Sequence, residues 1–267
     1  MILLLDFGNT RVKWHWANHQ GLVGESCSSD YQSKNLTTQL LDMVQSSFPD
    51  QQNQRIWPML QSVTVASVKP SISDSVIKAL EQLNLLVQTV RTAKQFDTLI
   101  NGYHEVKQMG VDRWLAMIAA RQLHSQVPTL VIDCGTAITI DAVAADGHHL
   151  GGYILPGLNR QLRALLENTE QVYATDFSRV QDVAFGQNTQ DCVIKGICAQ
   201  IIAVILHSLP RLDENPLPHI ILTGGDGKLI KRLLNKELKD SKWAVELREA
   251  LVFEGLLINA LKELKKM

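Results

Sequence analysis

Two short segments, one in each half of the chain, share one pattern. Asp6-Phe7-Gly8-Asn9-Thr10 follows the apolar run of residues 2–5, and Asp133-Cys134-Gly135-Thr136-Ala137 follows the apolar run of residues 130–132. In both cases another strand-like stretch comes next, which predicts a hairpin with glycine and hydroxyl groups in its turn. Glycine lets backbone amides approach a ligand closely, and carboxylates beside the turn suit a cation or its waters. The repeated pattern predicts two related halves that bind one polyphosphate.

Composition favours a globular protein and gives no support to a nucleic-acid partner. The 267 residues allow two domains, and 45% hydrophobic with 20% charged residues is typical of a globular protein. A formal net charge of −1 and a pI of about 6.7 give no basic field, so we expect no nucleic-acid partner. Lys195 and Gln200 interrupt the apolar run of residues 193–206, so we expect no membrane span either.

The first residues and the cysteines predict a cytoplasmic protein. Met1 leads directly into an apolar strand, without the basic segment and small-residue cleavage site of a signal peptide. The four cysteines show no CxxC spacing, and we interpret them as buried free thiols of a reducing compartment. They are Cys27, Cys134, Cys192 and Cys198.

Hydrophobic periodicity predicts an α/β fold with mixed sheets flanked by helices. We expect strands at residues 2–6, 12–17, 22–26, 63–67, 86–90, 129–133, 138–143, 149–154 and 219–222. We expect helices at residues 37–47, 73–83, 111–123, 158–167, 192–209, 228–235 and 251–265. The order of these elements in the first half is echoed in the second. We therefore divide the chain into an N-terminal half, residues 1–109, and a C-terminal half, residues 110–267.

The first hairpin has the groups that a phosphate site needs. Gly8 opens the turn, Asn9 and Thr10 add donors, and Lys13 returns on the next strand as a point charge for a β- or γ-phosphate. The alternative is an ordinary Gly-Asn turn between two core strands. The spacing matches neither the GxxxxGK[ST] loop nor GxGxxG, which excludes the P-loop and Rossmann classes.

The second half repeats this chemistry and adds a glycine-rich turn. Asp133 would bind a cation or its water shell and Thr136 a phosphate, although an aspartate that caps a strand end by local hydrogen bonds has the same sequence pattern. The segment Thr223-Gly224-Gly225-Asp226-Gly227 lies between a strand and a helix. Such a turn lets the chain pass close to a flat ligand such as adenosine and presents the free amides of a helix N-terminus.

A helix expected to begin at residue 111 brings a possible general base and an anion-binding side chain together. Asp112 could accept a proton from a substrate hydroxyl, and Arg113 could bind a carboxylate through two parallel hydrogen bonds. Acidic residues also favour the first turn of any helix, because they interact with its dipole and unpaired amides. The pattern alone leaves both interpretations open.

Taken in order, the motifs resemble those of type III pantothenate kinases, in the acetate and sugar kinase/Hsp70/actin superfamily. They extend from residue 6 to about residue 226. The further matching segments are Val65-Ala66-Ser67-Val68-Lys69-Pro70, Asn101-Gly102-Tyr103, Gly110-Val111-Asp112-Arg113-Trp114, Gly151-Gly152-Tyr153-Ile154-Leu155-Pro156-Gly157, Gly186-Gln187-Asn188-Thr189 and Thr223-Gly224-Gly225. The resemblance implies two actin-like (ribonuclease H-like) halves with a nucleotide cleft between them.

The resemblance also implies an activity and assigns residues to it. ATP would phosphorylate pantothenate to 4'-phosphopantothenate, the first step of coenzyme A biosynthesis, with Asp112 as the proton acceptor. ATP would be bound by Asp6, Phe7, Gly8, Asn9, Thr10, Arg11, Val12, Lys13 and Thr136. Pantothenate would be bound by Tyr103, Gly110, Val111, Asp112, Arg113 and Thr189. Asp133 matches the family's site for a monovalent cation, K⁺ or NH₄⁺, and Mg²⁺ would arrive with ATP. The family is homodimeric, and the helix at residues 192–209 is a plausible interface.

Small departures from the family pattern surround these motifs. Val106 and Met109 stand where Pro and Leu are common, and Lys69 stands where a smaller apolar residue is common. Two other functions stay open: a kinase for another hydroxy acid or for polyphosphate, and a nucleotide-dependent regulator of gene expression. The pocket residues of the pantothenate motif argue against the first. A DNA-binding regulator predicts a basic patch or recognition helix, and the sequence shows neither.

Overall fold

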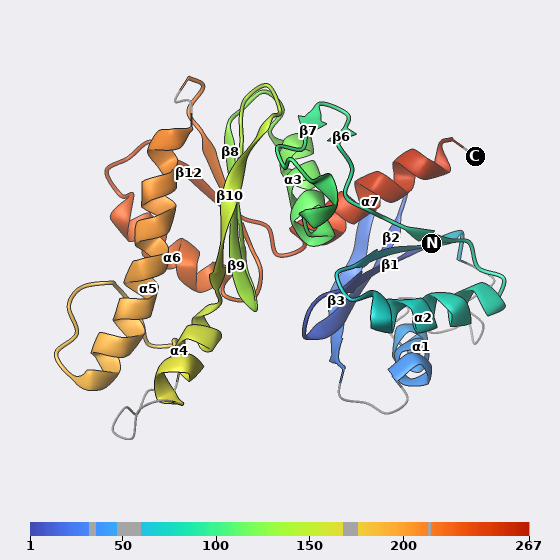
Figure 1. Cartoon of the computed structure of the whole chain (residues 1–267), viewed down its shortest axis with the longest axis horizontal. Helices are drawn as coiled ribbons and strands as arrows, with labels where there is room; N and C mark the ends of the chain where they lie inside the picture. Colours follow the sequence, from blue (N-terminus) through green and yellow to red (C-terminus); the bar gives the residue numbers. More distant parts are fainter. Residues whose placement is uncertain (32–35, 47–59, 168–175, 213–214, 267) are drawn as a thin grey trace. The chain divides into compact units, whose positions relative to one another are not determined.

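The chain forms two compact units in a computed structural model, which describes residues 1–31, 36–46, 60–167, 176–212 and 215–266 (Figure 1). The first unit comprises Met1–Ala93, Glu105–Ala119 and Ala250–Met267, and the second comprises Lys94–His104 and Ala120–Glu249. From the sequence we expected one boundary, after residue 109. The compact units are instead discontinuous, because the last helix, α7 (Leu251–Leu264), contacts the first sheet.

The first sheet has five strands in the order β3-β2-β1-β4-β5. The central strand β1 pairs antiparallel with β2 and parallel with β4, and the outer pairs are β2–β3, antiparallel, and β4–β5, parallel. The bounds are β1 (Ile2–Phe7), β2 (Arg11–Asn18), β3 (Gly21–Asp30), β4 (Ser62–Ser67) and β5 (Val87–Thr89). A meander followed by parallel crossovers is a mixed sheet, as the sequence predicted.

The second sheet repeats this topology strand for strand. Its order is β10-β9-β8-β11-β12, with β8–β9 and β9–β10 antiparallel and β8–β11 and β11–β12 parallel. The bounds are β8 (Thr129–Cys134), β9 (Ala137–Val143), β10 (His149–Pro156), β11 (His219–Thr223) and β12 (Ala244–Leu247). The internal duplication inferred from two hairpins therefore extends through both sheets.

Helices follow equivalent strands in the two sheets. α1 (Leu36–Ser46) and α2 (Pro70–Gln82) precede and follow β4, whereas α4 (Leu158–Leu166) and α5 (Thr189–Ser208) precede β11 and α6 (Gly227–Glu237) follows it. The helix α3 (Val111–Leu123) has the predicted bounds. Each other predicted element is present with shifted ends, and Ser47 of the first predicted helix lies outside the described residues. The sequence missed β6 (Gln95–Phe96), β7 (Leu99–Ile100), β12 and two 3₁₀ turns, Val106–Gln108 and Leu209–Arg211.

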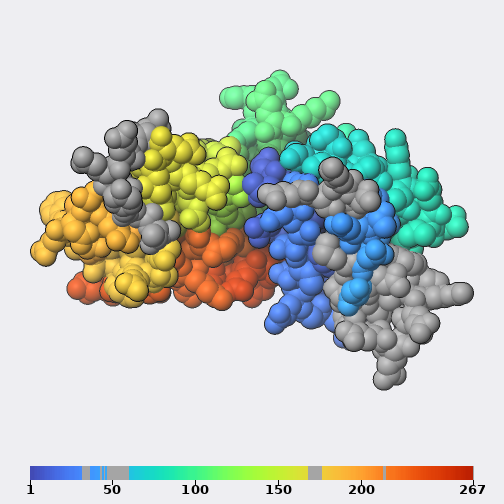
Figure 2. Space-filling view, turned by 90° about the horizontal axis from the view of Figure 1, so that it is seen from below, coloured from blue at the N-terminus to red at the C-terminus, as the bar shows by residue number. Residues whose placement is uncertain are grey.

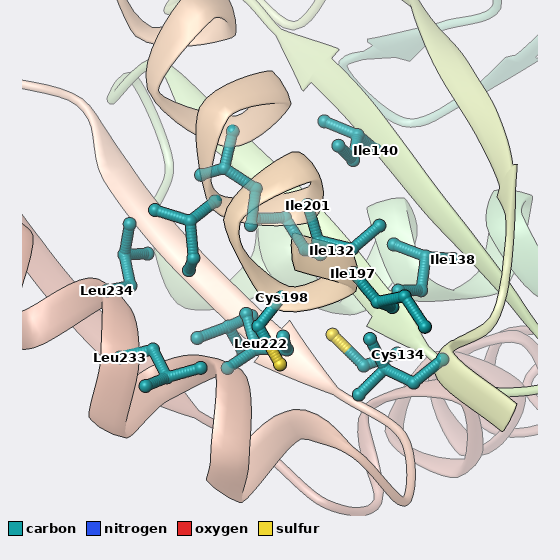
Figure 3. Close-up of a cluster of buried hydrophobic side chains, with 14 of the residues drawn as sticks. Ile132, Cys134, Ile138, Ile140, Ile197, Cys198, Ile201, Leu222, Leu233 and Leu234 are labelled. Atoms are coloured by element: carbon teal, nitrogen blue, oxygen red, sulfur yellow. The ribbon is translucent and has the colours of Figure 1, made fainter. Parts of the chain in front are cut away.

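In each unit an apolar face of the sheet packs against helices of the same unit. In the first unit, alternate residues of β1, β2 and β4 pack against α1 and α2. In the second, Ile132 and Ile140 of the sheet meet Ile201 of α5 and Leu233 of α6 (Figure 3). Alternation along a strand places such side chains on one face. These cores fix the strand ends from which the turns described below emerge.

The helix α5 corrects one sequence expectation. Residues Thr189–Arg211 form a helical segment long and apolar enough to span a membrane, although Lys195 and Gln200 had been taken to exclude one. The core helix of a soluble protein passes the same test of length and composition. Residues of α5 pack in the core of the second unit, among them Ile194, Ile201 and Ile205. Burial in this core explains part of the apolar composition, since 44% of the most apolar stretch is buried.

A histidine pair lies where β11 begins, and it predicts a loss of stability in acid. The rings of His124 and His219 are 4.1 Å apart, and His124 Nε2 lies 3.1 Å from a Glu246 carboxylate oxygen. Burial, and next the charge of His124, lower the pKa of His219 below 6.5. The unfolded chain therefore takes up this proton first, so stability should fall as the pH drops below 6.5. We expect His219→Gln to reduce the difference in unfolding free energy between pH 7.5 and pH 5.5, measured by urea denaturation; an unchanged difference would contradict this assignment.

Candidate active site

The first hairpin joins β1 to β2 at the carboxyl end of the central strand. Asp6 and Lys13 are cross-strand partners, and the Gly8 N–H donates to the Arg11 carbonyl at 3.1 Å. Asn9 and Thr10 are exposed in the turn, and Lys13 is exposed on β2. A carboxylate and an ammonium group therefore stand on one face of the sheet beside a turn with exposed polar side chains. The predicted hairpin is confirmed.

Three residues assigned to ATP have other roles in the hairpin. The side chains of Phe7 and Val12 are fully buried in the core of the first unit, which leaves only their backbone for a ligand. The exposed Arg11 guanidinium lies 3.4 Å from the Asp30 carboxylate on the neighbouring strand β3. The buried side chains of Phe7 and Val12 thus anchor both ends of the turn in the core, and the polar groups between them stay exposed.

Two residues that the sequence analysis did not select as site residues hold this turn. The Tyr31 hydroxyl donates to the Gly8 carbonyl at 2.8 Å, and the Lys69 ammonium donates to the Asn9 carbonyl at 3.3 Å. The same ammonium lies 4.9 Å from the centre of the Tyr31 ring. Burial, and next the Asp6 carboxylate, raise the pKa of Tyr31, so its hydroxyl remains a donor. The backbone of the turn is fixed by the side chains of the residue after β3 and the residue before α2.

Removing the Tyr31 hydroxyl should weaken ATP binding. A hydrogen bond of this kind contributes about 0.5–1.5 kcal/mol, so Tyr31→Phe should raise the KM for ATP by about 2- to 10-fold while kcat at saturating ATP changes little. Initial rates at varied ATP measure this effect. Tyr153→Phe, on β10, removes a hydroxyl from an exposed side chain and serves as the control. Equal KM values for the Tyr31 variant and the wild type would show that the turn needs no such support.

The second hairpin, between β8 and β9, has the same relation to its sheet. The Gly135 N–H donates to the Ala137 carbonyl at 3.0 Å, and Asp133 occupies the position in β8 that Asp6 occupies in β1. In both units, the segment that follows the parallel neighbour of the central strand (β4 or β11) forms an equivalent backbone hydrogen bond. Val68 N–H donates to the Phe7 carbonyl, and Asp226 N–H donates to the Cys134 carbonyl, each at 3.0 Å. The repeat therefore includes the hydrogen bonds around the turns.

Two helices of the second unit begin beside this hairpin. The N–H of Gly157, the residue before α4, donates to the Thr136 carbonyl at 3.1 Å, and Asp226 precedes α6. The first amides of a helix have no partner within the helix and favour anions. Burial raises the pKa of the Asp226 carboxyl. The exposed Thr136 side chain thus lies in a turn bordered by amides suited to phosphate.

The carboxylate of Asp133 is held where a cation could bind. A Cβ at Gly135 would lie 3.5 Å from Asp133 Oδ1, and one at Gly224 would overlap that oxygen. Among the described residues, no three or more His, Cys, Asp or Glu side chains cluster as metal ligands. A single carboxylate with neighbouring backbone carbonyls has the oxygen chemistry that hard cations prefer. These residues fit the proposed monovalent ion.

The two buried cysteines, Cys134 and Cys198, are unsuited to act as nucleophiles. Burial, and next the Asp133 carboxylate, raise the pKa of Cys134, and burial raises that of Cys198 to about 12. Both thiols stay protonated at neutral pH, and a thiol is a much weaker nucleophile than a thiolate. The expectation that all four cysteines are buried was wrong, because Cys192 is exposed and Cys27 is half-buried, although all four are free.

The start of α3 places the candidate base in the first unit. The Asp112 carboxylate accepts a hydrogen bond from the Arg113 N–H at 2.8 Å, and a Cβ at Gly110 would lie 2.5 Å from its Oδ1. That same Cβ would lie 4.0 Å from the Val68 side chain. The Val68 N–H donates to the Phe7 carbonyl, so Gly110, two residues before Asp112, lies near a segment that is bonded to the end of β1. Val111 is buried, and Arg113 is only 5% exposed.

The remaining candidate residues lie in the second unit. Tyr103 is half-buried, and its N–H donates to Asn101 Oδ1 at 2.9 Å. Thr189 begins α5 and lines a largely apolar groove of about 760 Å³ with Arg160, Leu165 and Gln200. The atoms of α4 and α5 lie side by side on the face shown in Figure 2. Tyr103 and Thr189 therefore lie in the same compact unit as Asp133 and Thr136. Asp112 and Arg113 lie in the unit that contains the first hairpin.

Comparison with protein families decides the affiliation of this chain. The family model described as type III pantothenate kinase matches residues 2–210. The chain belongs to the type III pantothenate kinase family. A type III pantothenate kinase from Colwellia psychrerythraea is 32% identical over 261 residues, which cover 96% of this chain and 98% of the relative. Another, from Dichelobacter nodosus, is 34% identical over 221 residues, or 80% of this chain and 81% of the relative.

Solved structures share the fold of this pantothenate kinase family member at low identity. A Campylobacter jejuni protein described as a Baf family transcriptional activator has a TM-score of 0.60 and 19% identity, over 99% of this chain and 100% of that one. The activator of the 2-hydroxyisocaproyl-CoA dehydratase from Clostridium difficile has a TM-score of 0.55 and 11% identity, over 99% and 96%. Identities this low show the fold alone. The predicted actin-like α/β class is confirmed.

Proposed function

We propose that this chain phosphorylates pantothenate with the residues that the family motifs assign. The reaction itself follows from family membership: ATP is the donor, and 4'-phosphopantothenate is the product, in the first step of coenzyme A biosynthesis. Phosphoryl transfer needs positioning and charge neutralisation more than covalent chemistry. The observation that carries the proposal is that Asp112, at the start of α3, belongs to the same compact unit as the first hairpin, with Gly110 near Val68, whose N–H donates to the Phe7 carbonyl.

The two hairpins would bind the phosphates of ATP. In the first, Asn9, Thr10 and Lys13 offer exposed polar groups beside the Gly8 turn. In the second, Thr136 offers a hydroxyl beside the starts of α4 and α6. Asp6 would hold waters of the Mg²⁺ that accompanies ATP, since Mg²⁺ keeps several waters and prefers carboxylates. Bound Mg²⁺ neutralises phosphate charge, and Lys13 adds to that neutralisation as a point charge.

Pantothenate would be bound by Tyr103, by residues 110–113 and by Thr189. Arg113 would bind its carboxylate through parallel hydrogen bonds, and Asp112 would align the primary hydroxyl and accept its proton. Thr189 would act from this chain or from the neighbouring subunit of a homodimer. Its place among the residues that line an apolar groove between α4 and α5 supports that role. We place the enzyme in the cytoplasm, where its substrates are soluble metabolites.

A monovalent cation would bind at Asp133. The carboxylate oxygen packs against Gly224 and Gly135 at the edge of the second hairpin. K⁺ or NH₄⁺ there would reduce the negative charge around the ATP phosphates without requiring a cage of side chains.

The test is ADP release from ATP and Mg²⁺, with and without pantothenate, in potassium and then in sodium buffer. We expect release that needs pantothenate and is at least several-fold faster in potassium. Asp133→Asn should remove the difference between the two buffers, because the amide carries no charge for the cation. Release without pantothenate would indicate another acceptor. Nucleotide binding without any turnover would favour the regulator, and equal rates in both buffers would contradict the cation site.

A further inference from the structure

A buried acid–base pair lies beneath Tyr103 in the second unit. His149 Nε2 is 3.0 Å from Asp141 Oδ1, and the two side chains are 0% and 2% exposed. Burial of such a pair costs free energy unless its geometry and hydrogen bonds are good, and it is not required for a stable core. No family motif assigns a role to either residue. The pair therefore calls for a reason other than stability.

Two glycines of the family motifs make room for this pair. A Cβ at Gly102 would overlap the His149 carbonyl oxygen. A Cβ at Gly152 would lie 2.8 Å from Asp141 Oδ1 and would overlap the Ile140 carbonyl. These distances are too short for any side chain, and the obstacle includes backbone at both places. Glycine at 102 and 152 thus allows the segment before Tyr103 and the strand β10 to close around the pair.

Tyr103 is held from two directions beside the pair. Its ring stacks on the His149 ring, with centroids 5.9 Å apart and planes inclined by 26°. Its N–H donates to Oδ1 of Asn101, which is fully buried. Asn101 is itself fixed, because its N–H and carbonyl bond to Lys94 at 2.9 and 3.0 Å. Asn101 fixes the backbone of Tyr103, and His149 supports its ring.

The orientation of the His149 ring depends on Asp141. Nδ1 of His149 is buried and has no hydrogen-bond partner among the described residues, whereas Nε2 faces the Asp141 carboxylate. A proton on Nε2 lets the ring donate to this carboxylate, which orients the ring. This single bond therefore sets the plane on which the Tyr103 ring rests.

We propose that His149 and Asp141 are positioning residues that fix the ring of Tyr103 for pantothenate. The inference rests on the proposed function, in which Tyr103 contacts pantothenate. His149 and Asp141 act through Tyr103 and touch neither substrate. A ring held in place by stacking contributes modestly more to binding free energy than a freely rotating one. Loss of this support should therefore weaken pantothenate binding and leave ATP binding unchanged.

The experiment is a double-mutant cycle on the full-length enzyme. His149→Gln removes the ring but keeps a donor for Asp141, and Tyr103→Leu removes the supported ring. We expect His149→Gln to raise the KM for pantothenate about 3- to 10-fold, with the KM for ATP unchanged. In the Tyr103→Leu background the same substitution should change the KM by less than about twofold. His15→Gln is the matched control, since His15 is 4% exposed and its ring contacts Phe253 in the first unit.

Several outcomes would decide the inference. Additive effects of the two substitutions, or an equal rise in the KM for ATP, would overturn it. So would an equal KM change in His15→Gln, because that would show general destabilisation. If His149→Gln fails to fold, Asp141→Asn in the same cycle gives the test, since the amide keeps the carboxylate's size. A wild type that releases no ADP in response to pantothenate would overturn the proposed function instead.

Discussion

Asp112→Asn is expected to lower kcat for pantothenate phosphorylation by about 10²- to 10⁴-fold, the usual contribution of a positioned general base. The amide matches the carboxylate in size, and its oxygen can still accept the Arg113 N–H bond seen at 2.8 Å. The start of α3 should therefore keep its structure. What the variant loses is the ability to take the proton from the attacking hydroxyl. Rates of ADP release at saturating ATP and pantothenate measure the loss.

The competing explanation of Asp112 is structural, and a matched variant separates the two. Acidic residues in the first helical turn stabilise a helix through its dipole by about 0.3–1 kcal/mol. Glu254 lies in the first turn of α7, in the same unit, so Glu254→Gln removes an equivalent charge from a helix start. If both variants lose similar stability and both keep kcat, Asp112 is a helix-start residue only. A collapse of kcat confined to Asp112→Asn, with similar unfolding midpoints, supports the base.

The sequence predicted those parts of the fold that depend on neighbouring residues. Apolar alternation and glycine turns are local, so both hairpins and their strands were recognised, and α3 was predicted from residue 111 to residue 123. The weakest local signals were missed. β12 has only four residues, one of them charged, and β6 and β7 have two residues each. Strands this short are stabilised by pairing with a neighbouring strand, and the hydrophobic periodicity of a sequence does not reveal such pairing.

Parts of the candidate site depend on contacts between distant residues, and those could not be predicted. Tyr31 bonds to a carbonyl 23 positions away, and Lys69 to one 60 positions away. His149 and Asp141 lie on neighbouring strands, but only the pairing of β9 with β10 and its register shift near residue 149 brings them together. The available signal was indirect. Glycines at 102 and 152 indicated close approach without saying what approached.

The position of α7 likewise depends on contacts between residues that are distant in the sequence, and it could not be predicted. It follows β12 in the sequence, as α3 follows β5, so a duplicated pattern assigns it to the C-terminal half. Yet α7 contacts β1, β3 and β4. Its close fit there is specific, because a Cβ at Gly255 would overlap the Leu115 carbonyl. Helical periodicity indicated an apolar face on α7 but not which sheet that face would cover.

The second large effect concerns a single methyl group in the glycine-rich turn before α6. Gly224 has a φ of +85°, where L-residues are strained, and a Cβ there would overlap Asp133 Oδ1 and lie 2.6 Å from the Cys134 carbonyl oxygen. Gly224→Ala should therefore lower the free energy of unfolding by about 2–4 kcal/mol, combining backbone strain with overpacking. Urea denaturation measures this change. Because the displaced atom is the proposed cation ligand, potassium activation should be lost in whatever fraction remains folded.

The adjacent glycine supplies a control that separates strain from ligand approach. A Cβ at Gly225 would meet no atom within 4 Å, so Gly225→Ala should leave the free energy of unfolding almost unchanged. If this turn passes close to adenosine, the added methyl should nevertheless raise the KM for ATP. Two alanines one residue apart thus have opposite expectations: lost stability and lost potassium response at 224, and retained stability with weaker ATP binding at 225. Equal stability losses would show that the turn tolerates no side chain at all, and an unchanged KM at 225 would place the nucleotide elsewhere.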